Sequence, residues 1–324
     1  MKNYTSLSDM ENLQEIISEA LALKKQNSSA NPGKGKTLGM LFFNPSLRTR
    51  LSTEKAAKLL GMDVMVMNAD KDGWALEFED GAVMDSNKAE HIKEAAAVLS
   101  QYCDIIAVRA FPGLVDREKD EQDMVINSFK KYASVPVVNL EGATSHPLQA
   151  LTDAITVTEL SNRKRPKVVL TWAPHPRALP QAVPNSFVEV MQRMDVELVI
   201  TNPEGYDLDP RIIKITPVIH DQNEALKNAD FVYVKNWSSY EHYGQILNED
   251  RSWTFDKEKL DLTNNAQVMH CLPVRRNVVI SDEVLDSPNS VVIHQANNRT
   301  FAAQAVLKKL LSPPTPEGGD SYNE

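Results

Sequence analysis

The stretch Lys36 to Gly61, KTLGMLFFNPSLRTRLSTEKAAKLLG, decides how the rest of the chain is understood. It predicts a short apolar strand, a turn at Asn44-Pro45 and then a helix. Asn-Pro interrupts a strand, Ser46 is a preferred residue for the N-cap of a helix, and Gly61 suits the left-handed position after the last turn. The stretch is therefore a strand that passes through a tight turn into a helix.

The start of this helix is a predicted anion site. Its first turn exposes unpaired backbone N–H groups and the positive end of the helix dipole, and both favour negative charge. Arg48 and Arg50 add positive charge there, and Ser46 and Thr49 add hydroxyl groups. A phosphate group is the natural ligand for this set. Taken alone, however, the SLRTR pattern fits an ordinary capped helix with two solvated arginines equally well.

Length and composition indicate a soluble globular protein. The 324 residues are enough for two α/β domains with complete cores, and the net charge of −9 argues against nucleic acid or an anionic membrane as the main partner. The N-terminal segment lacks the apolar core of a signal peptide, and no apolar run reaches the ~18 residues of a membrane span. With only Cys103 and Cys271, and no CxxC pair, the sequence indicates neither a disulfide framework nor a zinc site. A reducing cytoplasm is the expected location.

Apolar strands and amphipathic helices alternate along most of the chain, which predicts parallel sheets covered on both faces. An N-terminal helix is expected over residues 8–26, with a capping box that starts at Ser8. The long polar loop 69–86 carries Trp74, and residues 312–324 are expected to form a disordered tail. Further strands are predicted at 37–43, 63–68, 104–109, 135–140, 167–172, 197–201, 231–235, 267–270 and 291–294, and further helices at 87–100, 121–132, 143–160 and 298–311.

Residues 30–37, ANPGKGKT, nearly match the phosphate-binding loop GxxxxGK[ST] of nucleotide-binding proteins. A working loop of that kind follows a strand and opens a helix. This segment instead follows a predicted helix and opens a predicted strand, so its context argues against a nucleotide site.

Cationic or hydrogen-bonding side chains follow one predicted strand after another. Open parallel sheets bind ligands at the carboxyl ends of their strands, so these side chains are expected to meet at one edge. Each of them alone is more often a surface charge, a satisfied cap or an inert buried thiol, and only their coincidence indicates a site. In chain order they are Arg48, Thr49, Arg109, Glu141, His146, Gln149, His175, Arg177, Lys235, Cys271, Arg275, Arg276 and Arg299.

Three motifs carry a family resemblance. SLRTR at 46–50, HPLQ at 146–149 and HCLPVRR at 270–276 are similar to motifs of the aspartate/ornithine carbamoyltransferase family, and together they are highly specific. In that family the first two motifs hold carbamoyl phosphate and the third lies at the amine substrate. The resemblance implies two doubly wound parallel-sheet α/β domains. Residues 1–150, completed by the helix 298–311, would bind carbamoyl phosphate, and residues 151–297 would bind the amine.

The resemblance also implies roles for single residues, a homotrimer with sites between its subunits, and no metal or other cofactor. Trp74 would enter the site of a neighbouring subunit. Carbamoyl phosphate would be held by Ser46, Leu47, Arg48, Thr49, Trp74, Arg109, His146, Gln149, Cys271, Leu272 and Arg299, of which Arg48, Thr49, Arg109, His146 and Cys271 would take part in the chemistry. The amine substrate would be held by Ala89, Glu141, His175, Lys235, Leu272 and Arg275.

The segment 231–244, FVYVKNWSSYEHYG, departs from ordinary ornithine carbamoyltransferases. Those enzymes have an aspartate and an SMG motif here, and the aspartate meets the free α-ammonium group of ornithine. Lys235 would repel that group, whereas an acylated α-nitrogen carries no charge. The lysine can then pair with the α-carboxylate, as in the N-acylornithine carbamoyltransferases. The proline-rich loop 172–186 also resembles that branch, in which it encircles the segment near residue 235 to form a knot.

Charge and space near Ala89 indicate the identity of the acyl group. N-acetylornithine enzymes carry a glutamate where this chain has Ala89, and that glutamate would repel the second carboxylate of a succinyl group. Ala89 leaves room, and Arg275 can hold the carboxylate in a bidentate pair, although Glu90 argues the other way. We therefore expect N2-succinyl-L-ornithine as the substrate, with N-acetyl-L-ornithine as the alternative. Ordinary ornithine, a non-catalytic anion-binding relative and a nucleotide-binding protein are the lesser alternatives.

Overall fold

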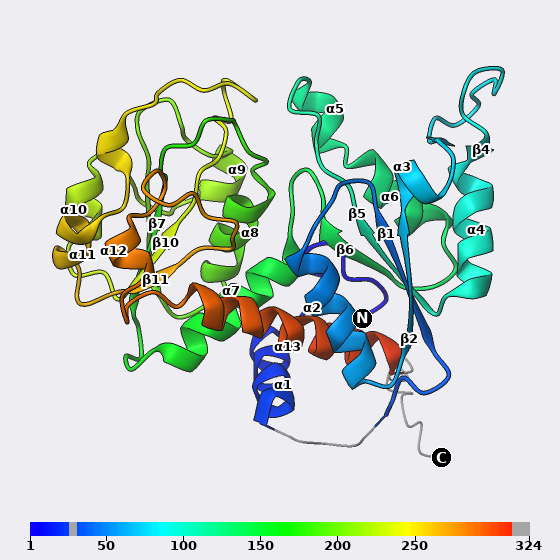
Figure 1. Ribbon diagram of the computed structural model, residues 1–324, viewed down its shortest axis with the longest axis horizontal. Helices are drawn as coiled ribbons and strands as arrows, with labels where there is room; N and C mark the ends of the chain where they lie inside the picture. Colours follow the sequence, from blue (N-terminus) through cyan, green and yellow to red (C-terminus); the bar gives the residue numbers. More distant parts are fainter. Residues whose placement is uncertain (26–30, 313–324) are drawn as a thin grey trace, which may run out of the picture.

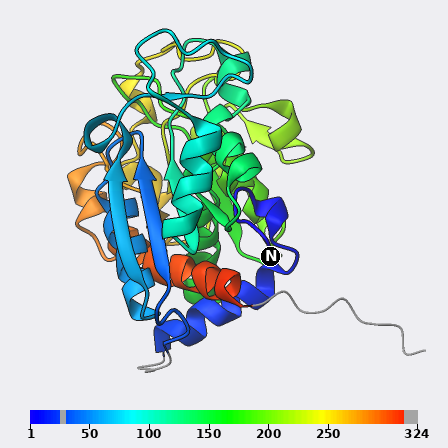
Figure 2. The ribbon, with the colours of Figure 1, turned by 90° about the vertical axis from the view of Figure 1, so that its right-hand side faces the viewer.

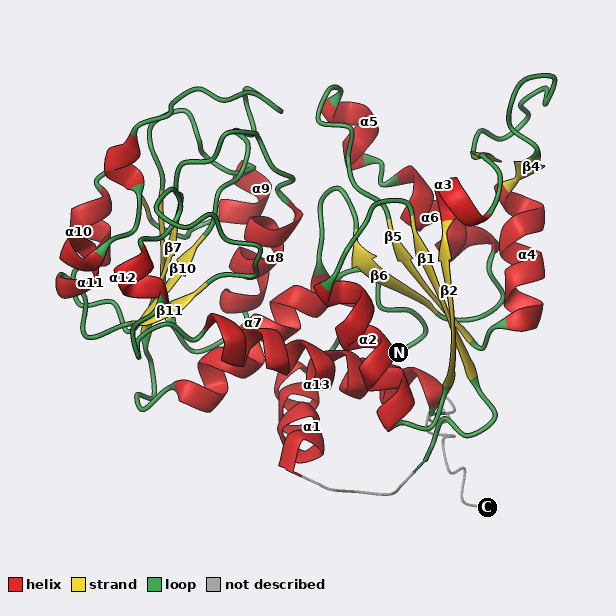
Figure 3. Cartoon of the chain, viewed as in Figure 1, coloured by secondary structure: helices red, strands yellow, loops and turns green. Residues whose placement is uncertain are grey.

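The computed structural model describes residues 1–25 and 31–312. Within them the chain forms two open parallel sheets that lie side by side, with helices packed around both (Figures 1 and 3). The prediction of an α/β protein with two doubly wound parallel sheets is confirmed. The predicted tail lies outside the described residues from residue 313 onward.

The first sheet consists of β1 (Thr37–Phe42), β2 (Asp63–Asn68), β5 (Ile105–Arg109) and β6 (Val137–Glu141). Its strand order is β2-β1-β5-β6, and all pairings are parallel. The chain moves outward from β1 to β2 and then returns to the other side of β1 to build β5 and β6. The carboxyl ends of β1 and β5 therefore flank the point where the winding reverses, which is where open α/β sheets bind ligands.

The second sheet repeats this plan with β7 (Lys167–Thr171), β8 (Glu197–Thr201), β9 (Val218–Ile219), β10 (Phe231–Val234) and β11 (Gln267–Met269). Its order is β11-β10-β7-β8-β9, again with parallel pairings. Its winding reverses between β7 and β10. The short strand β9 was not predicted, because two residues are too few for a periodic pattern.

Helices cover both faces of each sheet. On the first sheet, α4 (Ile92–Tyr102) and α6 (Met124–Tyr132) pack on one face. On the other face, α2 (Arg48–Leu59) packs between the sheet and α13 (Val292–Leu311) and contacts both. Figure 2 shows α13 running below this sheet beside α1 (Leu13–Lys25).

The other helices are α3 (Ala69–Asp72), α5 (Arg117–Glu121), α7 (Pro147–Leu160), α8 (Ala182–Met191), α9 (Pro210–Ile213), α10 (Gln222–Leu226), α11 (Lys257–Asp261) and α12 (Asp282–Leu285). Single 3₁₀ turns form at Leu7–Asp9 and Arg251–Trp253, and the short strands β3 (Leu76–Glu77) and β4 (Glu90–His91) pair in parallel.

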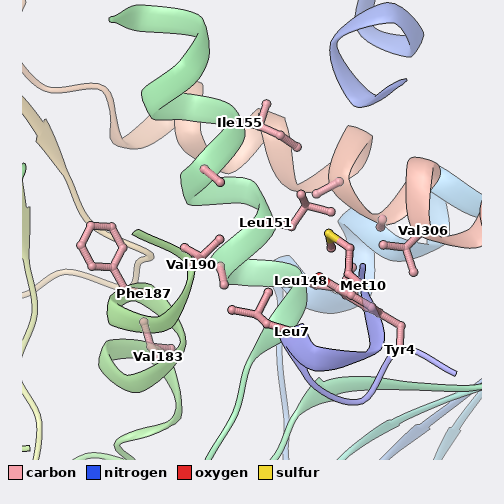
Figure 4. Close-up of a cluster of buried hydrophobic side chains, with 14 of the residues drawn as sticks. Tyr4, Leu7, Met10, Leu148, Leu151, Ile155, Val183, Phe187, Val190 and Val306 are labelled. Carbon is pink, nitrogen blue, oxygen red and sulfur yellow. The ribbon is translucent and has the colours of Figure 1, made fainter. Parts of the chain in front are cut away.

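Helix α7 joins the two halves and is buried on all sides from Pro147 to Val157. Figure 4 shows Leu151 and Ile155 of α7 between Phe187 on α8 and Val306 on α13. One apolar cluster contains side chains from both sheets and all three helices. A helix that is buried on all sides is a core element, and this one packs against both sheets.

The start of the chain differs from the prediction. Helix α1 begins at Leu13 rather than at Ser8, and the residue that caps the preceding 3₁₀ turn is Ser6. Asp9 accepts hydrogen bonds from the N–H groups of Ser6 (3.1 Å) and Thr5 (2.6 Å). The capping geometry therefore lies two residues upstream of the predicted one, with an aspartate in place of the glutamate.

The strand predicted at 291–294 is wrong, because these residues enter α13. Its β-branched apolar residues resemble a strand, but the pairing with β11 is a single isolated bridge between Val268 and Ser290, the residue before the predicted strand. Helix α13 thus begins six residues before the predicted residue 298. Similarly, the helix predicted at 87–100 begins at Ile92 after β4, and the helix predicted at 143–160 begins at Pro147. The predicted loop 69–86 contains α3 and β3.

The proline-rich loop contacts the segment after β10. The N–H of Ser238 donates to the carbonyl of Leu179 (3.2 Å), and Nε2 of Gln181 donates to the carbonyl of Ser238 (2.6 Å). These bonds bring together the two segments of the expected knot, whose threading stays a prediction. None of the helices in residues 1–25 and 31–312 is long and apolar enough to cross a membrane.

Gly39 in the central strand β1 yields a stability prediction. A Cβ at this position would lie 2.5 Å from the sulfur of Cys103. Gly39→Ala is therefore expected to lower the free energy of unfolding by ~1–3 kcal/mol through overpacking. Cys103→Ala removes the obstructing sulfur, so the double variant is expected to recover most of the loss. Urea unfolding of both single variants and the double variant tests this, and additive losses would contradict the contact.

Candidate active site

A cleft of about 940 Å³ lies between the carboxyl ends of the two sheets. It faces both points where the winding reverses, so residues that follow β1, β5 and β6 meet residues that follow β7, β10 and β11. Among its lining residues are fourteen that the sequence predicted. They are Ser46, Leu47, Arg48, Thr49, Arg109, Glu141, His146, Gln149, His175, Lys235, Cys271, Leu272, Arg275 and Arg299.

The amino end of α2 forms one wall of the cleft. The helix begins at Arg48, and the Ser46 hydroxyl accepts a hydrogen bond from the N–H of Thr49 (3.3 Å), so Ser46 caps it as predicted even though Leu47 occupies the formal N-cap position. Leu47 lines the cleft and is 67% exposed. Gly61 ends the helix with φ +81°, in the expected left-handed conformation. Free N–H groups and the guanidinium of Arg48 thus share one helix end.

Arg299, on α13, connects the amino end of α2 to α7 by hydrogen bonds. One guanidinium nitrogen donates to the hydroxyl of Thr49 (2.6 Å), and the other donates to Oε1 of Gln149 on α7. Arg299 is only 7% exposed, and burial lowers its pKa from the ordinary value for arginine. Because the Thr49 oxygen accepts from Arg299, its own proton is left to donate toward a ligand in the cleft.

Arg109, the last residue of β5, holds the turn after β1. It donates to the carbonyl of Pro45 (2.8 Å) and to Glu141 (3.0 Å), and its guanidinium lies 4.3 Å from the centre of the Phe111 ring. Burial raises the pKa of Glu141, while the positive charges of Arg109, Arg299, Lys235 and Arg48 oppose that rise. Glu141 is the one carboxylate among the residues that line the cleft, and it is already paired.

His146 is neutral at pH 7. Its side chain is 2% exposed, and burial together with the positive charges of Arg299 and Arg109 holds its pKa well below the ordinary value. Nε2 lies 3.7 Å from Glu141, and Nδ1 has no hydrogen-bond partner among the described residues. A neutral imidazole has one N–H, so His146 can donate a single hydrogen bond to a ligand oxygen.

The opposite wall comes from the second sheet. Nε of Arg275 donates to Nε2 of His175 (3.1 Å), whose Nδ1 lies 2.8 Å from the carbonyl of Arg177. Lys235 follows β10 and is 7% exposed. Burial raises the pKa of Cys271, so its sulfur is a thiol and not a thiolate. This wall therefore presents cations and a neutral sulfur, without a free carboxylate.

Arg276, expected at this edge from the sequence, does not line the cleft and instead pairs with Asp282 (2.7 Å) and Asp286 (2.6 Å). Two further predicted site residues, Trp74 and Ala89, do not line it either. They belong to the segment between β2 and α4, which projects from the side of the first sheet away from the second (Figure 1). The Trp74 side chain is 61% exposed, and its Nε1 donates to Glu90 (2.8 Å). The N–H of Ala89 donates to the carbonyl of Ala75 (3.2 Å), so both residues sit at the base of one projecting unit.

The cleft also contains residues that were given no role in substrate binding from the sequence. Arg177 was among the side chains expected to meet at this edge, and the rigid proline loop was a usable signal for Leu179 and Pro180. Pro45, Arg50 and Pro273 lie in the predicted turn and in the SLRTR and HCLPVRR motifs, so they also had a usable signal. The remaining residues lack a recognisable pattern, because they reach the cleft only through the packing of the two sheets. The unassigned lining residues are Phe42, Pro45, Arg50, Asn68, Phe111, Arg177, Leu179, Pro180, Val183 and Pro273.

Comparison with known proteins identifies the family. Residues 2–159 match the carbamoyl-P binding domain of the aspartate/ornithine carbamoyltransferases, and residues 180–310 match their Asp/Orn binding domain. The chain belongs to the aspartate/ornithine carbamoyltransferase family. It is a carbamoyltransferase, and its relatives place it in the N-acylornithine branch.

The relatives share nearly the whole chain. N-succinylornithine carbamoyltransferase of Bacteroides fragilis is 50% identical over 96% of this chain and 99% of its own. N-acetylornithine carbamoyltransferase of Xylella fastidiosa is 40% identical over 93% of this chain and 95% of its own. Ornithine carbamoyltransferase of Thermococcus kodakarensis is 32% identical over 92% of this chain and 91% of its own.

Solved structures of the same branch have the same fold. An acetylornithine transcarbamylase complexed with acetylcitrulline superimposes with a TM-score of 0.91 at 38% identity, over 97% of this chain and all of the other. A second structure is a variant of N-acetyl-L-ornithine transcarbamylase in which alanine replaces one glutamate, complexed with carbamyl phosphate and N-succinyl-L-norvaline. It superimposes with a TM-score of 0.90 at 38% identity, over 96% of this chain and all of the other.

The burial of His146 predicts a change in acid stability. A histidine whose pKa is lowered on folding takes up its proton only in the unfolded chain, so stability is lost as the pH falls below about 6.5. Between pH 7.5 and 5.5 the wild type is expected to lose about 1.4 kcal/mol more stability than His146→Gln. Urea unfolding at the two pH values measures this difference. His242→Gln, at an exposed position, is the matched control and is expected to behave like the wild type.

Proposed function

We propose that the enzyme transfers the carbamoyl group of carbamoyl phosphate to the δ-amine of N2-succinyl-L-ornithine. The products are N-succinyl-L-citrulline and phosphate, a step of arginine biosynthesis. The observation that carries the proposal is the charge of the cleft. Arg48, Arg109 and Arg299 line one wall and Lys235 and Arg275 the other, and the one carboxylate among the lining residues, Glu141, is paired with Arg109.

The wall formed by α2 suits carbamoyl phosphate. Arg48 and the free N–H groups of α2 would neutralise the phosphate, and Arg299 would contribute from α13. The Thr49 hydroxyl, Arg109 and the neutral His146 would donate hydrogen bonds to the carbonyl oxygen as it becomes an oxyanion. Such donors, fixed before the reaction, each contribute roughly 2.7–4 kcal/mol to transition-state stabilisation.

The reaction itself forms one bond and breaks one. The neutral δ-amine attacks the carbonyl carbon, a C–N bond forms, and the C–O bond to phosphate breaks from the tetrahedral intermediate. The departing phosphate is the proton acceptor in this scheme. The segment of Cys271 and Leu272 would orient the amine, and burial keeps Cys271 a thiol that does not compete as a nucleophile.

The opposite wall suits an acylated α-nitrogen. A free α-ammonium group would meet Lys235 and Arg275 without an unpaired carboxylate to receive it, whereas an amide nitrogen is neutral. Lys235 would pair with the α-carboxylate and Arg275, held by His175 at 3.1 Å, with the succinyl carboxylate. The greater identity to N-succinylornithine than to N-acetylornithine carbamoyltransferases, 50% against 40%, supports the same acyl group.

We also propose a homotrimer in which the segment of Trp74 and Ala89 completes the cleft of a neighbouring subunit. Both residues lie outside the cleft of their own chain, and Trp74 is exposed although it is aromatic. Leu51, Met65 and Val98, exposed on the same half of the chain, offer apolar surface for such a contact. Residues 1–150 with α13 would then bind carbamoyl phosphate, and residues 151–297 the acylornithine.

The substrate assignment predicts a clear order of acceptors. With carbamoyl phosphate in excess, kcat/KM is expected to be highest for N-succinyl-L-ornithine, at least about tenfold lower for N-acetyl-L-ornithine because one carboxylate contact is lost, and lowest for ornithine. A colorimetric assay for the ureido product measures all three in parallel. Ala89→Glu is expected to reverse the order of kcat/KM for N-succinyl-L-ornithine and N-acetyl-L-ornithine. A wild type that prefers ornithine would contradict the role of Lys235, and one that prefers the acetyl compound would leave only the general branch assignment.

Shared sites predict complementation between inactive variants. Arg48→Ala and Trp74→Ala are each expected to lower kcat/KM at least about 100-fold. When equal amounts are dissociated, mixed and reassembled, one site in four would combine an intact cleft with an intact neighbouring Trp74, so about a quarter of wild-type activity should return. A mixture of Arg48→Ala with Arg109→Ala is the control, because both changes damage the same cleft. Equal activity in both mixtures would exclude a shared site.

A further inference from the structure

Asp153 lies on α7 behind the cleft and has no part in the mechanism above. Its side chain is completely buried, with 0% exposure, and it does not line the cleft. Its Oδ1 accepts two hydrogen bonds, one from Nε2 of Gln149 and one from Nε2 of Gln295, each 2.7 Å long. One carboxylate oxygen therefore holds the amide nitrogens of two glutamines that come from different helices.

This arrangement fixes the direction of the Gln149 amide. Since its nitrogen is bound to Asp153, its oxygen must point the other way, and it accepts from Arg299. With the amide reversed, an NH₂ group would face the guanidinium, donor against donor. The donor-rich wall of the cleft thus gains one acceptor oxygen. The NH₂ of a carbamoyl group is a hydrogen-bond donor and needs such an acceptor.

Gln295 connects Asp153 to the second wall by hydrogen bonds, and its amide direction is fixed in the same way as that of Gln149. Its nitrogen is bound to Asp153, so its Oε1 accepts from the backbone N–H of His270 (2.9 Å). His270 is followed by Cys271 and Leu272, and the N–H of Leu272 donates to the His270 ring (2.8 Å). The segment expected to orient the amine therefore starts at a backbone group whose position depends on Asp153.

We propose that Asp153 is a positioning residue that sets the amide orientation of Gln149 and Gln295, and through them aligns the carbamoyl phosphate wall with the acceptor wall. The inference rests on the proposed function, because it assigns Gln149 Oε1 to the carbamoyl NH₂. Asp153 itself touches neither substrate. It lies buried on α7, where it binds Gln149 of the same helix and Gln295 of α13, and Gln295 in turn binds the N–H of His270 after β11, so Asp153 is the common anchor of both walls.

The ionisation of Asp153 agrees with this geometry. Burial raises its pKa to about 7, and the hydrogen bonds from Gln295 and Gln149 act in the opposite direction. The two amide donors thus stabilise the carboxylate in a site that otherwise disfavours charge. Either protonation state keeps an acceptor oxygen at Oδ1, so the positioning role does not require full ionisation.

Three variants test the proposal. Asp153→Asn keeps an acceptor oxygen, Asp153→Leu has nearly the same shape and none, and Thr152→Val is the matched control because it removes one buried hydrogen bond, to the carbonyl of Leu148, from the same helix. Calorimetry with carbamoyl phosphate gives the Kd, steady-state kinetics give kcat and KM, and thermal unfolding gives the stability. Asp153→Leu is expected to raise the Kd at least about tenfold, and Asp153→Asn and Thr152→Val less than about threefold.

A folded Asp153→Leu variant with the wild-type Kd would overturn the proposal, and so would an Asp153→Asn variant as weak as Asp153→Leu. Should Asp153→Leu not fold, Gln295→Met takes its place. That variant removes the hydrogen bonds of Gln295 to His270 and to Asp153 but leaves the bond between Gln149 and Asp153 in place. It is expected to raise the KM for the acylornithine about tenfold while the Kd of carbamoyl phosphate stays within about threefold. An unchanged KM in this variant would also overturn the proposal. A wild type that does not bind carbamoyl phosphate would instead remove the proposed function.

Discussion

The burial of positive charge between the two sheets is the constraint on which the rest of the structure depends. Arg109, Arg299 and Lys235 are 6%, 7% and 7% exposed. A buried charge costs several kcal/mol unless hydrogen bonds and opposite charges compensate it. Glu141 compensates part of it, and hydroxyl and amide oxygens accept from Arg299. The remaining positive charge faces the cleft, where the anionic substrates of the proposed function would complete the compensation and so contribute binding free energy.

Open α/β sheets bind ligands where their winding reverses, and both sheets of this chain have such a point. This explains why the site lies between the two sheets. Each sheet reverses its winding once, beside β1 and beside β7, and each reversal leaves space at the carboxyl ends of neighbouring strands. Because α7 is buried in a core shared by both halves, the two spaces face each other across one cleft. A transfer between two substrates benefits from this plan, since each sheet can hold one reactant and their separation is fixed by packing.

Selectivity in such a cleft follows from what it lacks as much as from what it contains. Its lining residues supply several cations and one carboxylate that is already paired, so a free α-ammonium group would be desolvated beside Lys235 without compensation. Under the proposed function, the exclusion of unmodified ornithine would be a repulsive effect, and recognition of an acyl carboxylate would be the attractive one. The two effects reside on different side chains, which allows them to be changed separately.

The sequence by itself determined the α/β class, most strand positions, and fourteen lining residues, because strand periodicity, helix caps and the three motifs are local properties of the chain. It placed Ser8 and residues 291–294 wrongly, where short segments fit two structures equally well. The tertiary structure decided that Trp74 and Ala89 lie outside their own cleft and that Asp153 lies behind it. It also decided which way the glutamine amides point. The directions of the amides depend on contacts between residues more than a hundred positions apart, Asp153 with Gln295 and Gln149 with Arg299, and such contacts leave no local periodicity to detect.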